Sequence, residues 1–305
     1  MAHQLPVSRR DVLKQAALGG TFAALSGRSL AFTAEENKPA GKVRDRLWVW
    51  AHAVGSYDNA WGLPGNSRLT PIEGARYLGV PNLIMIRYSG KPEPPFEEYA
   101  APFRSLQRIY WSITGAGGAT SADEREAVYR LAANMPNIAG VFMDDFFQIE
   151  ANDTDASPAK ASLTPDELRA IRDRLRIGNR RLDVGVTLYM HQLSPKILRH
   201  IDLCDVVSLW TWRSEDLNRL EQNFAKFREL APAKRVLLGL YMWDFGTNKP
   251  MPVDRMKHQC DLALKWLRAG QIEGMIFLAT NICDLKLETV EWTRNWIASV
   301  GDEQL

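Results

Sequence analysis

One short apolar stretch in the middle of the chain decides what kind of sheet the protein builds: Ile138-Ala139-Gly140-Val141-Phe142-Met143, followed by Asp144. Its apolar residues are continuous and do not alternate with polar ones. A strand with one face in water alternates, whereas a strand that is covered on both faces is apolar throughout. The stretch therefore predicts a buried strand over 138–144, in a parallel sheet with both faces covered.

Seven further runs have the same character and are rich in Val, Ile, Leu and aromatic residues. They are Leu47–Val54, Leu83–Tyr88, Arg108–Ile113, Leu182–Tyr189, Asp205–Trp212, Val236–Trp243 and Gly274–Thr280. Helical patterns separate the runs, and three of them begin with a hydroxyl residue followed three positions later by glutamate. This spacing is the signature of a capping box, in which each side chain accepts a hydrogen bond from the other residue's backbone. The three starts are Thr70–Glu73, Ser121–Glu124 and Thr164–Glu167.

The alternation of these strands and helices predicts an α/β protein in which residues 47–305 form a single (β/α)8 TIM barrel. A doubly wound open sheet is the alternative. That fold would carry a glycine-rich phosphate-binding turn after the first strand. The turn here is His52-Ala53-Val54-Gly55-Ser56, which lacks that pattern, so we favour the barrel.

The N-terminus resembles a twin-arginine signal peptide. Ser8-Arg9-Arg10-Asp11-Val12-Leu13-Lys14 precedes a mildly apolar stretch over 15–25, and small residues ending at Ala31 and Ala34 mark two candidate cleavage positions. We assign residues 1–34 to the signal and 35–46 to a polar linker; an amphipathic N-terminal helix is the alternative. The resemblance implies the twin-arginine export machinery as a partner and a periplasmic or secreted mature protein. The apolar stretch is too short to span a bilayer, and no later segment reaches about 18 apolar residues, so we expect no stable membrane span in the mature protein.

Charge and cysteine content exclude several classes of protein. The chain has a formal net charge of +2, and residues 1–31 carry +3 of it, so the mature part is close to −1. This balance does not favour nucleic acid or an acidic membrane surface as a partner.

The three cysteines, Cys204, Cys260 and Cys283, are odd in number and widely spaced. That spacing argues against a disulfide framework or a zinc knuckle, and we expect free thiols.

In a TIM barrel the functional site lies at the C-terminal ends of the strands. The predicted strands place many chemically capable side chains at those ends. The candidates for substrate binding are Trp50, His52, Arg87, Tyr189, His191, Trp212, Tyr241, Trp243 and Asn281, and the candidates for catalysis are Asp144, Asp145 and Asp244. The loops over about 53–69 and 146–163 are long enough to form walls or lids.

The adjacent aspartates Asp144 and Asp145 are the sharpest feature of the sequence, because they follow Phe142-Met143 and precede Phe146-Phe147. Desolvation raises the pKa of a carboxyl group, and a neighbouring carboxylate raises it further. One protonated and one ionised carboxyl are what a glycosidase needs. Adjacent strand residues point to opposite faces. Both therefore reach one pocket only if the backbone bends there; otherwise one of them holds the following loop.

Aromatic side chains are the second signal. Trp50, Trp212 and Trp243 fall near the C-terminal ends of predicted strands. Indole rings stack on the C–H faces of pyranose sugars and donate a hydrogen bond from their N–H. The same rings could equally fill the barrel interior. Together with the carboxyl pair, they predict a carbohydrate substrate.

A metal site is the main alternative chemistry. His52 and His191, with Asp144 and Asp244, could supply nitrogen and oxygen ligands to zinc or manganese in a hydrolase or isomerase. No His-x-His occurs on the first strand and no close ligand spacing appears. The glycine-rich segment over 115–118 lacks the lysine of a P-loop, so a tight loop is favoured over a phosphate site. We therefore expect neither a metal nor a cofactor.

The barrel with paired aspartates after its fourth strand and aromatics on the later strands resembles TIM-barrel glycoside hydrolases. Within them, Asp144-Asp145 is similar to the doublet of the adjacent-aspartate β-N-acetylglucosaminidases. The resemblance implies that Asp144 orients the substrate's 2-acetamido group, which attacks the anomeric carbon, and that Asp145 is the general acid/base. The chain lacks the strand-four and strand-seven glutamates of other glycosidases and offers Asp244 instead. A mechanism using Asp145 with Asp244, and a non-catalytic sugar-binding barrel, stay open.

The twin-arginine assignment makes a prediction about export. Changing Arg9 and Arg10 together to lysine should leave the precursor in the cytoplasm, because the paired arginines are the recognition element of the signal. Fractionation of cells into cytoplasm and periplasm, followed by immunoblotting, measures this. Undiminished export of the double variant would show that another route carries the protein.

Overall fold

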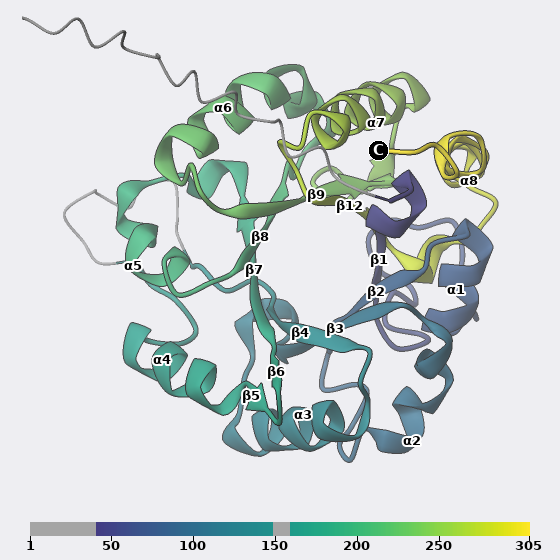
Figure 1. The fold of residues 1–305 in the computed structure, drawn as a ribbon. Helices are drawn as coiled ribbons and strands as arrows, with labels where there is room; N and C mark the ends of the chain where they lie inside the picture. The colour runs from purple at the N-terminus through teal and green to yellow at the C-terminus, as the bar shows by residue number, and fades with distance from the viewer. Residues whose placement is uncertain (1–40, 149–158) are drawn as a thin grey trace, which may run out of the picture. The chain divides into compact units, whose positions relative to one another are not determined.

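A computed structural model of the protein describes residues 41–148 and 159–305. The predicted signal peptide and residues 35–40 of the predicted linker lie outside these residues. Eight parallel strands close into a barrel in the order β1-β12-β9-β8-β7-β4-β3-β2, which confirms the (β/α)8 fold (Figure 1). The strands are β1 Leu47–Ala51, β2 Asn82–Met85, β3 Arg108–Thr114, β4 Ile138–Met143, β7 Asp183–Tyr189, β8 Val206–Trp210, β9 Arg235–Tyr241 and β12 Gly274–Leu278.

Helices surround the barrel and cover the outer face of the strands (Figure 1). They are α1 Pro71–Leu78, α2 Glu97–Ala100, α3 Ala122–Asn134, α4 Pro165–Arg174, α5 Leu198–Ile201, α6 Leu220–Leu230, α7 Val253–Arg268 and α8 Glu288–Val300. Two short hairpins lie outside the barrel sheet: β5 Arg176–Ile177 with β6 Arg180–Arg181, and β10 Trp243–Asp244 with β11 Lys249–Pro250. Among the described residues no helix is both long and apolar enough to cross a membrane.

The capping boxes predicted at Thr70–Glu73 and Thr164–Glu167 are both formed, with the glutamate carboxylate accepting from the cap N–H at 2.8 Å in each. The third predicted box is only half formed. The Ser121 hydroxyl accepts from the N–H of Glu124 at 3.2 Å, but the carboxylate of Glu124 forms an ion pair with Arg87 instead of returning to the cap.

Most of the predicted strands extend beyond the observed ones. In the predicted run Leu47–Val54 the observed strand ends at Ala51, and in the run Leu83–Tyr88 it ends at Met85. The residues that follow, such as His52 and Ile86, are still buried, but beneath the loops of the barrel mouth. Apolar character marks burial and does not distinguish the ladder from what lies just beyond it. The candidate site residues therefore stand on the first loop positions as well as on strands.

Large aromatic rings fill the barrel interior because glycines on the neighbouring strands leave space for them. A Cβ added at Gly239 of β9 would lie 2.0 Å from the ring of Trp210 on β8, and one at Gly185 of β7 would lie 2.4 Å from the ring of Phe142 on β4. Trp50 meets both rings edge-on, with centroid distances of 5.3 Å to Trp210 and 5.7 Å to Phe142. The three rings form a dry floor beneath the C-terminal ends of the strands.

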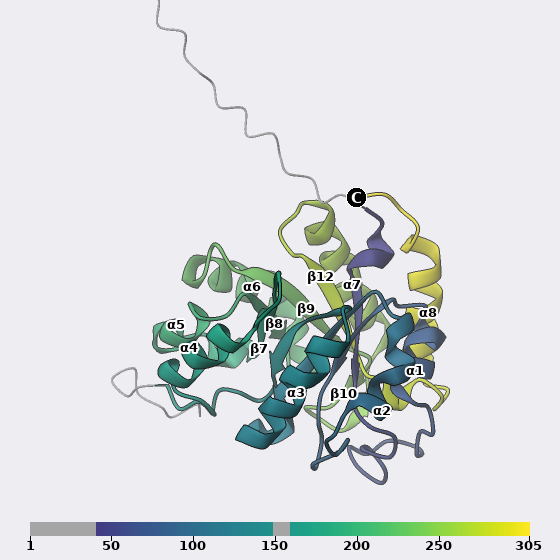
Figure 2. The same cartoon turned by 60° about the horizontal axis from the view of Figure 1, so that its bottom comes forward.

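The opposite end of the barrel is closed by the part of the expected linker that the structure describes. Residues 41–46 contain the 3-10 helix Val43–Arg46 and pack against the end of α8. Val43 is fully buried, and its N–H donates to the carbonyl of Glu303 at 2.9 Å. Figure 2 shows the chain's C-terminus at this end and the long loops, including the one after β1, at the other. Cys204, Cys260 and Cys283 are free and buried, as predicted.

The packing of rings over glycines makes a prediction about stability. Gly239→Ala should lower the free energy of unfolding by about 1–3 kcal/mol, because its Cβ would overlap the Trp210 ring and the two strands cannot separate without losing ladder hydrogen bonds. Urea denaturation followed by circular dichroism measures it. Gly65→Ala is the control, since its Cβ would meet only a Leu285 methyl at 3.6 Å. Equal transition midpoints for the two variants would contradict the packing argument.

Candidate active site at the barrel mouth

The backbone bends between the two aspartates that follow β4. Asp145 has a φ of 43°, in the left-handed region that residues other than glycine seldom adopt. The bend reverses the alternation expected of a strand, so Asp144 and Asp145 both line one hollow at the mouth of the barrel. The condition set by the sequence analysis for a shared pocket is met, because a local backbone outlier places both carboxyls on the same side.

Both oxygens of the Asp145 carboxylate have a protein donor. The hydroxyl of Tyr189, at the end of β7, donates to Oδ1 at 2.7 Å, and the backbone N–H of Gly117 donates to Oδ2 at 2.8 Å. Gly117 belongs to the glycine-rich segment after β3 and has a φ of 71°. The segment that the sequence analysis considered for phosphate thus binds an internal carboxylate, which fixes the orientation of Asp145.

Asp144 is the buried member of the doublet, with 6% of its surface exposed. Burial and the charge of Asp145 both raise the pKa of Asp144 well above its ordinary value, and the hydrogen bond from the Thr187 hydroxyl at 3.2 Å opposes this only in part. The surroundings of Asp144 therefore favour its protonated form over its ionised form. Two carboxyls in one hollow, one of them buried more deeply than the other, are an arrangement that general acid–base chemistry uses.

His52, directly after β1, is fully engaged by protein partners. Its Nε2 accepts from the indole N–H of Trp50 at 3.2 Å, so its Nδ1 carries the proton and donates to the carbonyl of Ile86 at 3.0 Å. Burial lowers the pKa of His52 to about 4. The imidazole is neutral at physiological pH, and both of its nitrogens are occupied, which leaves neither of them available to a metal.

The hollow that contains the doublet, called the central hollow below, has a volume of about 90 Å³. Aromatic rings from four strands and from the loops that follow strands, including the β1–α1 loop, form most of its wall. The lining residues are Trp50, His52, Tyr57, Trp61, Tyr88, Ala116, Asp144, Asp145, Thr187, Tyr189, Trp210, Trp212, Tyr241, Phe245 and Leu278. Such a wall offers flat apolar faces beside a few polar groups, as sugar-binding pockets do.

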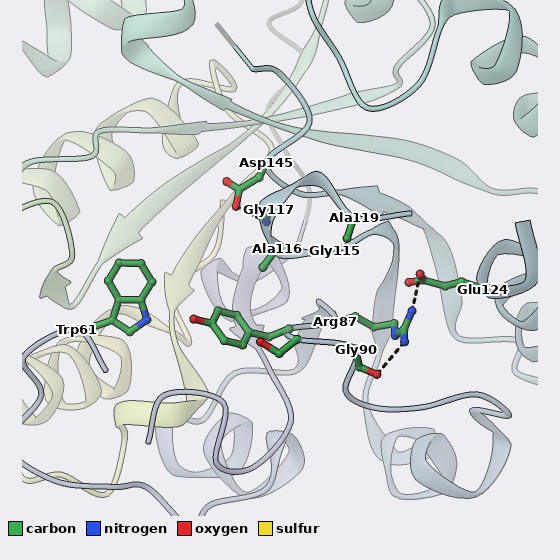
Figure 3. A pocket seen from close by; sticks show the side chains of 11 residues that line it. Trp61, Arg87, Gly90, Gly115, Ala116, Gly117, Ala119, Glu124 and Asp145 are labelled. Carbon is green, nitrogen blue, oxygen red and sulfur yellow. Dashed lines mark hydrogen bonds and ion pairs between the residues drawn. The ribbon is translucent and has the colours of Figure 1, made fainter. Parts of the chain in front are cut away.

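Two larger hollows adjoin the central one, and Asp145 lines all three. The Arg87 hollow, of about 420 Å³, is bounded by Trp61 on one side and by Arg87 and Glu124 on the other (Figure 3). The His191 hollow, of about 320 Å³, is lined by His191 and Trp212 among others. Asp145 therefore stands at the junction of a continuous depression across the barrel mouth.

The structure brings most of the predicted site residues to this depression. The central hollow is lined by Trp50, His52, Tyr189, Trp212 and Tyr241. Arg87 lines the Arg87 hollow, and His191 lines the His191 hollow. His191 also stacks on Tyr189 with a centroid distance of 5.6 Å.

Three predicted residues do not line any of these hollows, because each is committed to holding a loop. The Asp244 carboxylate accepts from the backbone N–H groups of Ser214 at 3.3 Å and Thr247 at 3.1 Å. The Trp243 indole donates to the carbonyl of Trp61 at 2.9 Å. The Asn281 side chain accepts from the N–H of His52 at 3.2 Å and donates to the carbonyl of Ala53 at 2.9 Å. All three side chains act on loop backbone.

Several residues of the site were not among the sequence-based candidates. They are Tyr57, Trp61, Thr187, Gly117 and Glu124. Thr187 could have been found, because it lies two positions before Tyr189 on the same strand and side chains of a strand face the same way at every second position. Trp61 and Tyr57 belong to the long loop after β1, where no periodicity indicates which side chain turns inward.

Within residues 41–148 and 159–305, no group of three or more His, Cys, Asp and Glu side chains is arranged to hold a metal ion. The metal alternative combined His52, His191, Asp144 and Asp244. The structure places Asp244 away from the hollows and occupies both nitrogens of His52, so these four side chains do not converge.

Comparison with known proteins gives the fold and no family. No protein-family profile matches the sequence, and no curated protein matches it significantly. Solved structures do match. The catalytic domain of a hyperthermophilic chitinase from Pyrococcus furiosus has a TM-score of 0.56 at 12% identity, covering 88% of this chain and 99% of that one.

Two further structures have a TM-score of 0.50. The spore cortex-lytic enzyme of Bacillus megaterium is 10% identical over 86% of this chain and 75% of its own, and a xylanase-A-amylase inhibitor protein is 14% identical over 84% and 98%. At these identities the similarity establishes a shared barrel. An inhibitor and enzymes both occur on it, so the function has to be argued from the site.

Burial of His52 makes a prediction about stability and pH. An unfolded histidine has a pKa of about 6.5, so between pH 6.5 and pH 4 the unfolded chain binds a proton that folded His52 does not. The free energy of unfolding should therefore fall as the pH falls through this window, with His52 contributing about 3 kcal/mol. Denaturation at a series of pH values should show a shallower slope for His52→Gln than for the wild type. His258→Gln, at an exposed position on α7, should keep the wild-type slope; equal slopes for all three proteins would contradict the neutral state of His52.

Proposed function

We propose that this protein hydrolyses the glycosidic bonds of a carbohydrate. The observation that carries the proposal is the bend at Asp145, which turns two adjacent carboxyls into one aromatic-lined hollow at the C-terminal end of the barrel. Glycoside hydrolysis needs a proton donor for the leaving oxygen and a second group that acts at the anomeric carbon or positions the group that does. The doublet can supply the donor and the positioning group.

Asp145 is assigned to the leaving oxygen because of its position. It lines the central hollow and both hollows beside it, so a chain of sugar units lying along the depression would place a linkage against its carboxyl. Asp144 lines the central hollow and is buried. Its carboxyl is suited to bind a substituent of the sugar unit that occupies the central hollow.

The coupling between the two carboxyls supplies the proton at the right place. In the protein alone, burial and the Asp145 charge raise the pKa of Asp144 and so favour a proton on that carboxyl. A substrate N–H that donates to Asp144 favours its ionised form, because a carboxylate is a stronger acceptor than a neutral carboxyl. Two ionised carboxylates side by side repel each other, so in this scheme the proton that leaves Asp144 is placed on Asp145. Binding thus transfers the proton to the carboxyl that faces the glycosidic oxygen.

A 2-acetamido sugar fits this scheme. Its N–H would donate to Asp144, and its carbonyl oxygen would attack the anomeric carbon while Asp145 protonates the leaving group. The resemblance of Asp144-Asp145 to the doublet of the adjacent-aspartate β-N-acetylglucosaminidases supports this assignment. Water, activated by Asp145 as a base, then opens the cyclic intermediate. In these steps Asp145 is first the acid and then the base, and Asp144 is the positioning group.

We also propose that the enzyme acts outside the cytoplasm. The support is Arg9-Arg10 and the candidate cleavage positions at Ala31 and Ala34. A polymeric carbohydrate substrate in the periplasm or the medium agrees with a depression that extends on both sides of the doublet.

The roles of the two aspartates predict different responses to the leaving group. Asp145→Asn should abolish hydrolysis of natural glycosides, a loss of about 10²–10⁴ in kcat/KM, and spare much of the activity on aryl glycosides with acidic phenols, which leave without a proton. Asp144→Asn should reduce both activities, because positioning of the internal nucleophile matters whatever group leaves. Initial rates on a matched pair of N-acetylglucosaminides, one natural and one aryl, measure this.

Asp261→Asn is the control for these two variants, since that aspartate is exposed on α7 outside the barrel. It should hydrolyse both substrates at the wild-type rate. The opposite pattern for the two doublet variants would exchange their roles. Nearly full activity of both would mean that the doublet is structural and would contradict the proposed mechanism.

A further inference from the structure

The Arg87 hollow has a buried ion pair in its wall. Arg87 follows β2, and its guanidinium pairs with Glu124 on the first turn of α3 (Figure 3). The Nε–H of Arg87 also donates to the carbonyl of Pro92 at 2.9 Å, and its Nη2 donates to that of Gly90 at 2.8 Å. Three protein acceptors thus hold the guanidinium in one orientation, across the hollow from Trp61 (Figure 3).

Glu124 has one carboxylate oxygen with no partner. Its Oε2 meets Arg87, whereas its Oε1 has no hydrogen-bond partner within the part of the chain that the structure describes, and the residue is only 4% exposed. An unpartnered buried carboxylate oxygen is unfavourable, because the group has lost its water without replacing the hydrogen bonds. The same carboxylate has also given up the capping box at Ser121. Both features indicate that Glu124 is positioned for a ligand donor.

Arg87 complements this acceptor with donors. A guanidinium has five N–H groups, and three of them serve Pro92, Gly90 and Glu124, which leaves two. Within the described residues, this wall therefore holds two Arg87 N–H groups and one buried Glu124 oxygen that have no protein partner. A hydroxyl group, which both donates and accepts, satisfies the pair. A lone ammonium would be repelled by Arg87, and a carboxylate would be repelled by Glu124.

The formal charges of the lining residues disfavour anionic ligands. Among the lining residues that the structure describes, Arg87 and Glu124 cancel, and Asp145 is the other charged group. These lining charges do not sum to a positive value, so the Arg87 guanidinium is not a general anion site. Its volume of about 420 Å³ lies within the range of about 300–1,000 Å³ typical of ligand pockets.

We propose that the Arg87 hollow binds the sugar unit next to the scissile bond, that Arg87 and Glu124 together recognise one of its hydroxyl groups, and that the hollow rejects uronic acids. The inference rests on the proposed function and adds its substrate class: a neutral polysaccharide. Glu124 is a specificity residue in this scheme and takes no part in bond cleavage.

The experiment compares two oligosaccharides of similar length. Chitotetraose contains neutral N-acetylglucosamine units, whereas a hyaluronan tetrasaccharide alternates these with glucuronate. Binding is measured by isothermal titration calorimetry with the Asp144→Asn variant, which keeps the Asp145 charge and should not turn over the sugar. Chitotetraose should bind at least tenfold more tightly than the hyaluronan tetrasaccharide.

Glu124→Gln in this background should weaken chitotetraose binding about tenfold, the effect of losing a hydrogen bond to a charged group. It should also reduce the difference in affinity between chitotetraose and the hyaluronan tetrasaccharide, because it leaves the Arg87 guanidinium without its anionic partner. Glu126→Gln is the matched control: Glu126 lies two residues along α3 and forms an exposed ion pair with Arg174. It should leave both affinities unchanged. Arg87→Lys keeps the positive charge but loses the planar set of N–H donors. It should lower the affinity for chitotetraose without raising the affinity for the hyaluronan tetrasaccharide, and it is the variant to use if Glu124→Gln does not fold.

The outcomes separate the inference from the function on which it rests. Equal affinities for the two tetrasaccharides, or no effect of Glu124→Gln in a folded protein, would overturn the inference while hydrolysis by the wild type stands. Tighter binding of fully deacetylated chitotetraose than of chitotetraose would overturn the neutral assignment in favour of a cationic unit. Failure of all the sugars to bind would count against the proposed function itself.

Discussion

The rest of the site depends on the packing of aromatic rings over glycines inside the barrel. Trp210 and Phe142 cross the interior over Gly239 and Gly185, and Trp50 closes the gap between the two rings. Water is excluded beneath the strand ends, since the rings fill the space. That exclusion raises the pKa of Asp144 and lowers the pKa of the adjacent His52. The floor thus shifts the pKa values of two groups that line the central hollow, Asp144 and His52.

Above this floor, a local departure from strand geometry creates the site. A left-handed residue after β4 is unfavourable by about 1–3 kcal/mol, yet it turns the Asp145 carboxyl to the same side as Asp144. The Tyr189 hydroxyl and the Gly117 N–H hold Asp145 there, from β7 and from the loop after β3. The strain is therefore balanced by contacts from two other parts of the chain, and it brings two coupled carboxyls into one hollow. A barrel shared with chitinase and inhibitor structures acquires its chemistry from such local features.

Glu124 likewise departs from the local pattern of its helix and makes a contact in the site instead. Its position in Ser121–Glu124 would normally close a capping box, which stabilises a helix start by about 1 kcal/mol. Here the carboxylate turns to Arg87, and the helix keeps only the serine half of the cap. Departures from local consistency tend to mark functional positions. The departure at Glu124 lies in the wall of the Arg87 hollow, which Asp145 also lines, whereas neither Thr70 nor Thr164, where the two boxes are intact, lines that hollow.

The amino-acid sequence alone determined the barrel, the end of it that carries the site and the doublet after β4, because continuous apolar strands and capped helices are local patterns and parallel strands end on one side. Strand ends were less well determined, since burial under loops looks the same in sequence as burial in the ladder. Only the tertiary structure decided that Asp145 bends toward Asp144, because contacts from Tyr189 and Gly117 select that backbone state. It also decided that Asp244, Trp243 and Asn281 hold loop backbone while Trp61 and Glu124 face the hollows, since a loop residue's direction depends on partners that are distant in sequence.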